Sequence, residues 1–196
     1  MRVLVAPDKF AGTLTAVEAA EAIAEGWRRR SPSDEIDLAP MSDGGPGFVD
    51  VLHAATGGDL VIVTVTGPLG EATPATILLD GPTAYVESAQ ACGLQLTGGE
   101  GVEVASTVGV GQLVAAAVDA GATTVVVGLG GSGTNDGGAG LLHALGATAD
   151  GRLDAGPLRL SDVTSVDLGP ARERLAGVTL VAASDVDSPL TGLFGA

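Results

Sequence analysis

The sequence predicts an α/β protein, and three observations support that prediction. The 196-residue chain is 45% hydrophobic but only 3% aromatic, so its core is expected to consist of valine, leucine, alanine and isoleucine. Its 31 glycines and many alanines favour close packing of helices on a sheet. Short β-branched runs also alternate with apolar segments at helical spacing. A chain of this length forms one ordinary domain or two small ones.

The chain opens on an apolar strand at residues 2–6, and a loop at residues 7–12 follows at the carboxyl end of that strand. Thr13 or Thr15 then caps a helix. Glu18 stands three residues after Thr15, which is the spacing of a capping box. The helix ends in three consecutive arginines, whose positive charge suits the negative end of a helix dipole.

A second strand at residues 35–39 ends in a glycine-rich loop at residues 40–47, and a helix follows. Asp8 and Lys9 in the first loop and Asp43 in the second loop lie at equivalent ends of two successive strands. In open α/β sheets, ligands bind at the carboxyl ends of the strands. We therefore expect the two loops to face one cleft.

The pattern changes after Gly57 and Gly58. Three strand-like runs then follow one another, and the first two form a hairpin-like pair rather than a βαβ unit. These runs are residues 60–66, 76–79 and 83–87. A mixed sheet is therefore expected, and a domain boundary near the two glycines divides the chain into residues 1–58 and 59–196.

Residues 125–147 are the segment around which the chain is organised: a β-branched apolar run, a loop dense in glycine and an apolar segment at helical spacing. This order predicts strand, loop and helix. The glycines let the backbone adopt positive φ and expose successive N–H groups, and Asn135 or Asp136 can cap the helix. Such a loop before a helix N-terminus binds anions, so we predict a phosphate site.

Two other interpretations of this loop are open. Residues 128–133 match the dinucleotide fingerprint G-x-G-x-x-G, but the helix of that motif opens near its last glycine, whereas two further glycines follow here. A dinucleotide oxidoreductase would also need an acidic residue about 20 positions later. Asp150 and Asp154 stand there, in a predicted polar hairpin rather than at a strand end. The other alternative, a tight turn without function, needs fewer glycines than this loop contains.

The rest of the chain is less regular, and residues 88–96 show no clear periodicity. The expected elements are a helix at 106–120, a polar hairpin or loop at 148–157, a short helix at 172–175 and a strand at 178–183. Asp185 and Asp187 follow that last strand. If the strand has ended before them, both carboxylates can address a metal ion or a hydroxyl group.

The charge and cysteine content exclude several classes of function. A formal net charge of −15, with eight arginines and the single lysine Lys9, argues against nucleic acid or an anionic membrane as a partner. Cys92 is alone, so the sequence holds no internal disulfide and no cysteine metal cluster. No apolar run has the length of a membrane span, and the chain goes directly into a strand. We therefore expect neither leader nor anchor, and a cytoplasmic protein.

Several short motifs, taken in order, resemble the glycerate kinase type 1 family. They are Ala6-Pro7-Asp8-Lys9-Phe10, Ser42-Asp43-Gly44-Gly45, Val86-Glu87-Ser88-Ala89, Gly109-Val110-Gly111-Gln112, the block from Thr134 to Gly140, and Asp185-Val186-Asp187. The resemblance covers the whole chain as an N-terminal portion of the family. It implies ATP-dependent phosphorylation of D-glycerate at the 2-hydroxyl, which gives 2-phosphoglycerate, with Mg²⁺ as cofactor.

The resemblance also implies an architecture and a set of partners. Two α/β domains with a cleft between them are expected, the first Rossmann-like and incomplete in this chain, the second with a mixed sheet that carries the glycine-rich loop. The expected partners are D-glycerate and ATP, with no nucleic acid and no membrane, and a homodimer is left open. A kinase must hold the polyphosphate and present an acceptor oxygen in line with it.

The candidate site residues follow from the motifs and from this resemblance. The phosphate cradle is assigned to Gly130, Gly131, Ser132, Gly133, Thr134 and Asn135, and the substrate loops to Asp8, Lys9, Gly44 and Gly45. Asp187, Asp185 and Asp43 are the candidate catalytic carboxylates, which would take the hydroxyl proton or bind Mg²⁺. Asp136 is either a metal ligand or a helix cap.

The chain departs from the family pattern at four positions. Ala11 replaces a lysine, Pro46 a glutamate, Gly133 an alanine and Ser188 an asparagine. Ala11, Pro46 and the early end of the chain support an alternative function, a truncated, non-catalytic remnant of the same family that binds a nucleotide or a metabolite.

Overall fold

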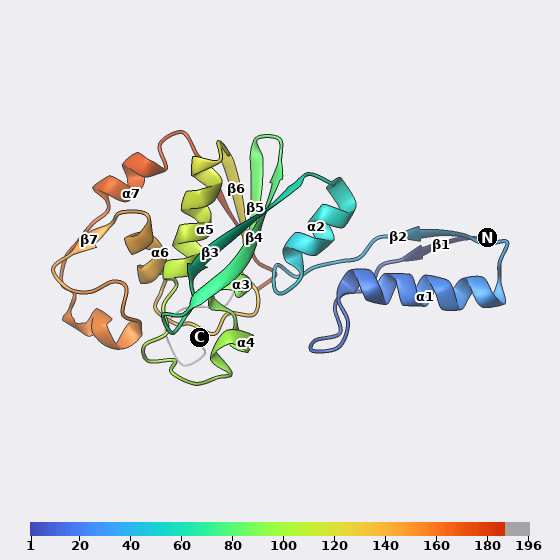
Figure 1. Cartoon of the computed structure of the whole chain (residues 1–196), viewed down its shortest axis with the longest axis horizontal. Coiled ribbons are helices and arrows are strands. Elements are labelled where there is room, and N and C mark those ends of the chain that lie inside the picture. Colours follow the sequence, from blue (N-terminus) through green and yellow to red (C-terminus); the bar gives the residue numbers. More distant parts are fainter. Residues whose placement is uncertain (187–196) are drawn as a thin grey trace.

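The computed structural model describes residues 1–186 and consists of a five-stranded sheet with its helices and a smaller unit that extends from it (Figure 1). The smaller unit contains β1 (Arg2–Val5), α1 (Ala16–Arg30) and β2 (Glu35–Leu38), and its two strands pair in parallel. Thr15 caps α1: its hydroxyl accepts from the Glu18 N–H at 3.1 Å, and the Glu18 carboxylate accepts from the Thr15 N–H at 2.8 Å. The capping box is therefore formed at Thr15.

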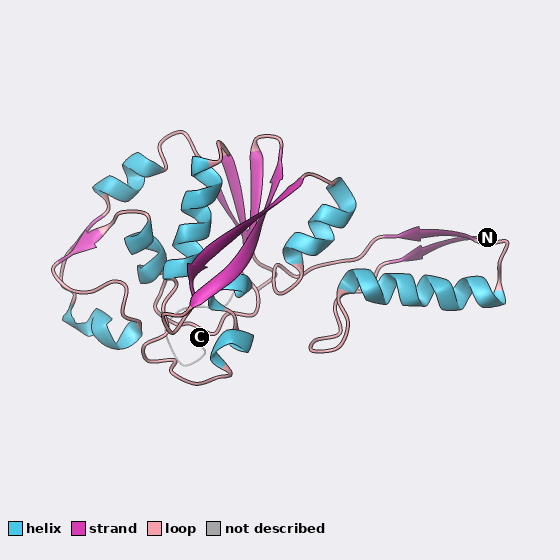
Figure 2. Cartoon of the chain, in the orientation of Figure 1, coloured by secondary structure: helices cyan, strands magenta, loops and turns pink. Residues whose placement is uncertain are grey.

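The larger unit is built on a mixed sheet, as the sequence predicts (Figure 2). Its strands are β3 (Asp59–Thr66), β4 (Ala72–Asp80), β5 (Thr83–Glu87), β6 (Thr124–Gly128) and β9 (Thr179–Ala183), in the spatial order β3-β4-β5-β6-β9. β3, β4 and β5 pair antiparallel, whereas β5, β6 and β9 pair in parallel. The carboxyl ends of β5, β6 and β9 therefore lie at one edge of the sheet.

The helices of the larger unit cover both faces of the sheet. They are α2 (Phe48–Thr56), α3 (Ala89–Cys92), α4 (Leu94–Thr97), α5 (Val108–Asp119), α6 (Ala139–Ala144) and α7 (Gly169–Arg174), with a 3-10 helix at Pro157–Asp162. The side chains of Ala84 and Val86 are fully buried in the cluster that includes α5. Tyr85, between them, contacts Phe48 of α2 edge-to-face at 6.3 Å. Because side chains alternate along a strand, α2 and α5 lie on opposite faces.

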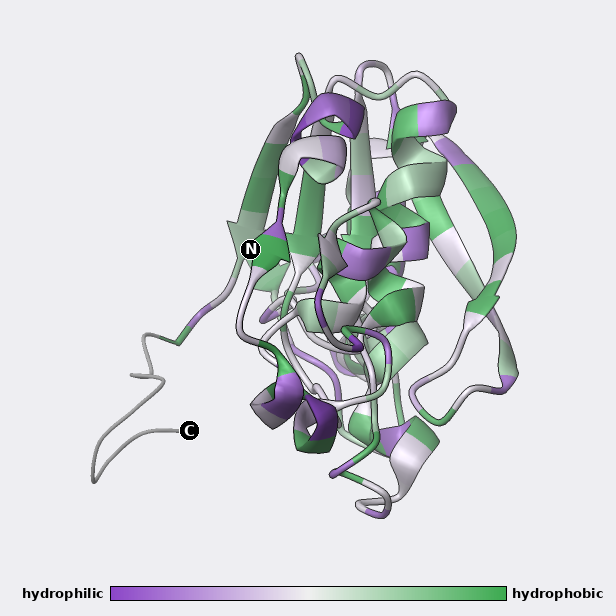
Figure 3. Cartoon of the chain, turned by 90° about the vertical axis from the view of Figure 1, so that its left-hand side faces the viewer, coloured by the Kyte–Doolittle hydropathy of each residue, from purple (hydrophilic) through white to green (hydrophobic). Residues whose placement is uncertain are grey.

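The hydrophobic core belongs to this larger unit, where apolar residues gather in the strands and in the helix packed on them (Figure 3). Leu113, Val114 and Val125 are fully buried in it. No described helix is both long and apolar enough to cross a membrane. The boundary at residues 57–58 stays a prediction; α2, which precedes it, packs against β4 and β5.

Two segments are defined more sharply by the structure than by the sequence. Residues 88–97 hold the one-turn helices α3 and α4, which are too short to show a helical period in the sequence. At 148–157 the loop alternative is the one formed, and its only strand is β7 (Thr148–Ala149), whose partner is the distant β8 (Val166–Asp167). Asp150 joins the β7 segment to the β8 segment, because its carboxylate accepts from the Thr164 N–H at 3.0 Å and the Ser165 N–H at 3.1 Å.

Candidate functional site

Loops from separate strands meet at the carboxyl edge of the large sheet. The Gly130 N–H donates to the Gly44 carbonyl at 3.1 Å, which joins the loop after β6 to the loop after β2. The Leu129 N–H donates to the Ala183 carbonyl at 3.0 Å, at the end of β9. The first loop is tied in as well, since the Met41 N–H donates to the Pro7 carbonyl at 2.8 Å. The structure thus brings together the first two loops, as strand order predicts, and it places the loop after β6 beside the second of them.

The contact between the two glycine-rich loops leaves no space for side chains. A Cβ atom on Gly130 would lie 2.5 Å from both the nitrogen and the Cα atom of Gly45. A Cβ atom on Gly128 would lie 2.4 Å from the Gly44 carbonyl oxygen. Glycine is therefore required here for close approach of two backbones rather than for positive φ.

Lys9 reaches across to the second loop. Its ammonium lies 2.8 Å from Asp43 Oδ2 and 3.6 Å from Asp8 Oδ1, and the Lys9 side chain is 20% exposed. Burial alone would lower the pKa of Lys9, but the hydrogen bond to Asp43 and the charges of Asp43 and Asp8 outweigh it and raise that pKa. The same hydrogen bond from Lys9 lowers the pKa of Asp43. Both groups are charged at neutral pH.

The loop after β6 has some of its N–H groups already in use. The Gly133 N–H donates to the Cys92 carbonyl at 2.7 Å, and the Thr134 N–H to the Ser132 hydroxyl at 3.2 Å. Within residues 1–186 the N–H groups of Gly131 and Ser132 have no acceptor. The part of the predicted cradle open to an anion is therefore centred on these two N–H groups and the Ser132 hydroxyl, while the exposed Asn135 lies beyond them.

Asp136 is 1% exposed and joins two helix starts. Its carboxylate accepts from the Thr107 N–H at 2.9 Å, before α5, and from the N–H groups of Gly138 and Gly140 at 3.0 and 3.1 Å, at the start of α6. The Thr107 hydroxyl also donates to it. The N-cap position of α6 is Gly138, so the expectation that Asn135 or Asp136 occupies it is wrong. The Asp136 carboxylate nevertheless acts as a cap, because it accepts from N–H groups at the start of the helix. Metal binding by Asp136 stays a prediction, and it would require exchange of several of these bonds.

Among the described residues, no hydrogen bond or ion pair joins Asp185, the first candidate carboxylate after β9, to the other loops. Asp185 is exposed, and no other described residue donates to its side chain. Asp187 lies outside the described residues. Their catalytic roles stay predictions.

Glu87, at the end of β5, is a residue that the sequence patterns do not single out on their own. It is 4% exposed, and Oε2 accepts from the N–H groups of Gly47 and Val49 at 3.1 and 3.3 Å, where α2 begins. Burial raises the pKa of Glu87, although these two hydrogen bonds act in the opposite direction. The carboxylate fixes the end of the Asp43 loop. The only sequence signal is a charged residue that ends an apolar strand.

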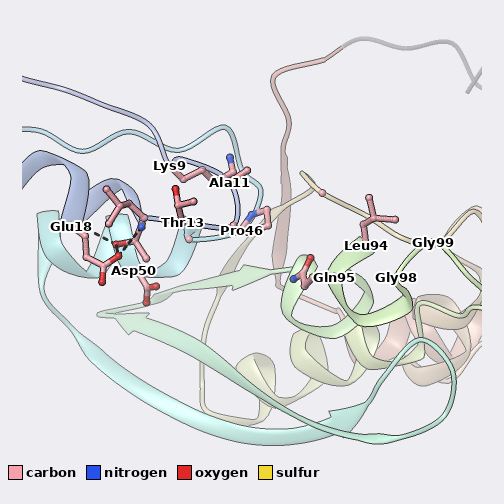
Figure 4. A pocket seen from close by; sticks show the side chains of 15 residues that line it. Lys9, Ala11, Thr13, Glu18, Pro46, Asp50, Leu94, Gln95, Gly98 and Gly99 are labelled. Carbon is pink, nitrogen blue, oxygen red and sulfur yellow. Dashed lines mark hydrogen bonds between the residues drawn. The ribbon is translucent and has the colours of Figure 1, made fainter.

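A cavity of about 960 Å³ lies between the smaller unit and the loops of the larger one (Figure 4). Lys9, Thr13 and Pro46 line it on one side, and Leu94 and Gln95 line it on the other. Gly131 also borders it, so the glycine-rich loop and the lysine reach the same space. Its volume lies within the usual range for small-molecule sites.

The residues around this cavity fit a nucleotide with its magnesium ion. Lys9 supplies a cation and Gly131 an N–H group without an acceptor, both of which suit phosphate. Magnesium is usually held by one or two carboxylates together with the phosphates it accompanies. Asp43 and Asp8 carry such carboxylates beside Lys9, although neither lines the cavity itself. The described residues hold no cluster of three metal-binding side chains.

Fold and site together define an α/β protein with a glycine-rich loop at the carboxyl edge of its sheet. The model of the glycerate kinase family matches residues 3–196. The chain is 42% identical to glycerate kinase of Bacillus subtilis and 40% identical to glycerate 2-kinase of Escherichia coli. Both alignments cover the whole of the 196-residue chain. The chain belongs to the glycerate kinase family.

Further comparisons agree with this assignment. The chain is 48% identical to an uncharacterised protein of Mycobacterium bovis. It superposes with a TM-score of 0.83 and 37% identity on a crystal structure from Salmonella typhimurium LT2 that carries the provisional name glycerate kinase 2. The chain spans about half the length of the relatives it matches: 53% of the Bacillus protein, 54% of the Escherichia protein and 55% of the Salmonella chain.

Proposed function

We propose that the protein transfers a phosphoryl group from ATP to D-glycerate and forms 2-phosphoglycerate. The observation that supports this most is the contact of the Gly44 and Gly130 backbones, which sets the Lys9–Asp43 pair beside the glycine-rich loop. Family membership and the names of the relatives support ATP and glycerate as ligands. We include in this proposal that the β1–α1–β2 unit is part of a Rossmann-like domain.

The roles of the residues follow from their chemistry. Lys9 binds a phosphate or the glycerate carboxylate as a point charge, and the N–H groups of Gly131 and Ser132 orient the phosphoryl oxygens. Asp43, whose pKa is lowered by Lys9, is a weak base and so suits magnesium better than a proton. Magnesium, when bound with ATP, offsets the phosphate charge. Proton acceptance from the glycerate hydroxyl is then assigned to Asp185 or Asp187.

The second candidate function is binding without turnover. Lys9 is the one cation among the described residues that line the large cavity, and Asp43 already pairs with it. A site with so little positive charge gives little stabilisation to a transferring phosphoryl group.

One assay separates the two candidates. The 196-residue chain is incubated with ATP, Mg²⁺ and D-glycerate, ADP is followed in a coupled assay, and the product is identified by phosphorus NMR. Glycerate-dependent ADP formation with 2-phosphoglycerate as product supports the kinase. Saturable ATP binding with no glycerate-dependent ADP supports the binding protein, and the absence of both contradicts the proposal.

A further inference from the structure

A second cavity, of about 440 Å³, borders the glycine-rich loop next to the one that contains Lys9. Gly131 lines the first cavity, whereas Ser132, Thr134 and Asn135 line the second. Ser88 and Cys92 close it from the β5 side. Three residues of this loop therefore face a space that the Lys9–Asp43 pair does not line.

The Ser88 hydroxyl is the observation that points to a ligand in this space. Ser88 is 3% exposed, and its Oγ atom has no hydrogen-bond partner among the described residues. Buried polar groups are almost always hydrogen-bonded, because a hydroxyl removed from water without a partner is destabilising. Three more hydroxyl-bearing residues line the same cavity: the hydroxyls of Ser132 and Thr134 are 2.9 Å apart, and that of Thr107 donates to Asp136.

The charge of the cavity limits what it can bind. Among the described residues that line it there is no lysine, arginine or histidine. Its one carboxylate, on Asp136, is occupied by hydrogen bonds from Thr107, Gly138 and Gly140. Apart from the Ser132 N–H group and hydroxyl at its border, such a space offers no group that would balance the charge of a free anion. Hydroxyls both donate and accept, so they match a neutral group with hydroxyls of its own.

We propose that the second cavity binds an uncharged group with adjacent hydroxyls, with Ser88 as one of its hydrogen-bonding partners. The ribose of a nucleoside and the diol of a small polyol share this chemistry. The inference rests on the proposed function, because ATP and glycerate each carry such a group. Val110, Leu129 and Leu141 supply an apolar wall against which the non-hydroxyl part packs.

The test uses uncharged probes, which need neither Lys9 nor magnesium. The ¹⁵N-labelled chain is titrated separately with adenosine and with glycerol, and amide shifts are followed by NMR. We expect saturable shifts at Ser88, Thr134 and Asn135 with one of the probes, and none at Gly12 or Gly98 in the larger cavity. The probe that binds identifies the source of the hydroxyls. This result does not depend on phosphoryl transfer, so it can fail or succeed independently of the kinase assay.

A serine-to-alanine pair makes the test specific. Ser88→Ala should weaken probe binding about three- to tenfold, the loss expected for one hydrogen bond. The variant should keep the stability of the parent chain, because the hydroxyl has no partner to lose. Ser161→Ala, which removes an exposed hydroxyl that bonds only to the Leu158 carbonyl, should bind like the parent. Shifts confined to the larger cavity, no saturable shift with either probe, or unchanged binding by Ser88→Ala would each overturn the proposal.

Discussion

The two units of the molecule use the same kinds of elements but are stabilised differently. In the β1–α1–β2 unit the buried side chains are small, and larger apolar ones face water: Leu4 is 67% exposed and Ile23 is 43% exposed. In the larger unit, Leu113 and Val125 are fully buried. The smaller unit therefore depends on local features such as the capping box of α1, whereas the larger one depends on its core. The comparison teaches that two units whose helices and strands both follow from local sequence patterns can still differ in how their folds are stabilised.

Asp136→Ala should have the largest effect. Removal of the buried carboxylate leaves the N–H groups of Thr107, Gly138 and Gly140 without an acceptor. Each such group costs about 1–3 kcal/mol, so we expect the free energy of unfolding to fall by about 3 kcal/mol or more. Urea unfolding followed by circular dichroism measures this. Asp162→Ala, at an exposed residue, should change it by less than about 0.5 kcal/mol. If the free energy of unfolding falls by less than about 1 kcal/mol in Asp136→Ala, Asp136 does not stabilise the contact between the N-termini of α5 and α6.

The same substitution should have opposite signs in the two units. Gly130→Ala places a Cβ atom against the Gly45 backbone, so we expect a loss of about 1–3 kcal/mol. Gly26→Ala lies within α1 with open space around the new atom, so it should stabilise that helix by about 0.5–1 kcal/mol.

Two probes read the two units separately. Trp27 is the only tryptophan and lies at the end of α1, so its fluorescence follows the smaller unit. Circular dichroism follows the whole chain. If Gly130→Ala leaves the free energy of unfolding unchanged, the close contact between the two glycine-rich loops is contradicted.

Glu87 should make the larger unit less stable as the pH rises. Because burial raises the pKa of Glu87 above its ordinary value of 4.5, the folded chain holds this proton more tightly than the unfolded chain does. The resulting stability is full below pH 4.5 and is lost as the pH rises through the raised pKa. In Glu87→Gln the free energy of unfolding should therefore fall less over this pH range than in the parent chain. Glu173→Gln, at an exposed residue, should behave like the parent. If the free energy of unfolding changes with pH by the same amount in the parent and in Glu87→Gln, the loss of stability does not come from Glu87.

Asp150 should have the smallest effect on stability, and its contribution should be lost as the pH falls, which is the opposite of Glu87. Hydrogen bonds from Thr164 and Ser165 lower the pKa of Asp150 to about 2. Its contribution to stability is therefore present above pH 3.8 and lost as the pH falls toward about 2. In Asp150→Asn this acid-dependent loss should be smaller than in the parent chain, as measured by thermal unfolding between pH 2 and pH 5. A loss of the same size in both chains would exclude the role of Asp150 at low pH.

Elements and loops with local signals could be predicted from the sequence. The Thr15–Glu18 spacing predicts the cap of α1, and strand order predicts that the Asp8–Lys9 loop and the Asp43 loop lie together, as the Met41–Pro7 hydrogen bond shows. Residues 125–147 do form strand, loop and helix, although α6 has only six residues. These features depend on neighbours in sequence or on the rule that parallel strands end together.

Features that depend on distant contacts could not be predicted. The bonds from Thr107 to Asp136 join segments that no local pattern relates. Glu87 looks like the polar end of a strand, and only the tertiary structure shows that it holds α2. The exposed leucine and isoleucine of the smaller unit also follow a regular apolar pattern, so burial could not be inferred from it.

The central claim is that Lys9, the Asp43 loop and the loop after β6 form one site for a phosphorylated ligand. The most direct measurement is the dissociation constant of Mg-ATP by titration calorimetry, for the parent chain and for Lys9→Met. Loss of a charged partner should weaken binding about tenfold or more. Arg159→Met, which removes an exposed cation on the 3-10 helix, should bind like the parent. Equal affinity of Lys9→Met and the parent would contradict the account.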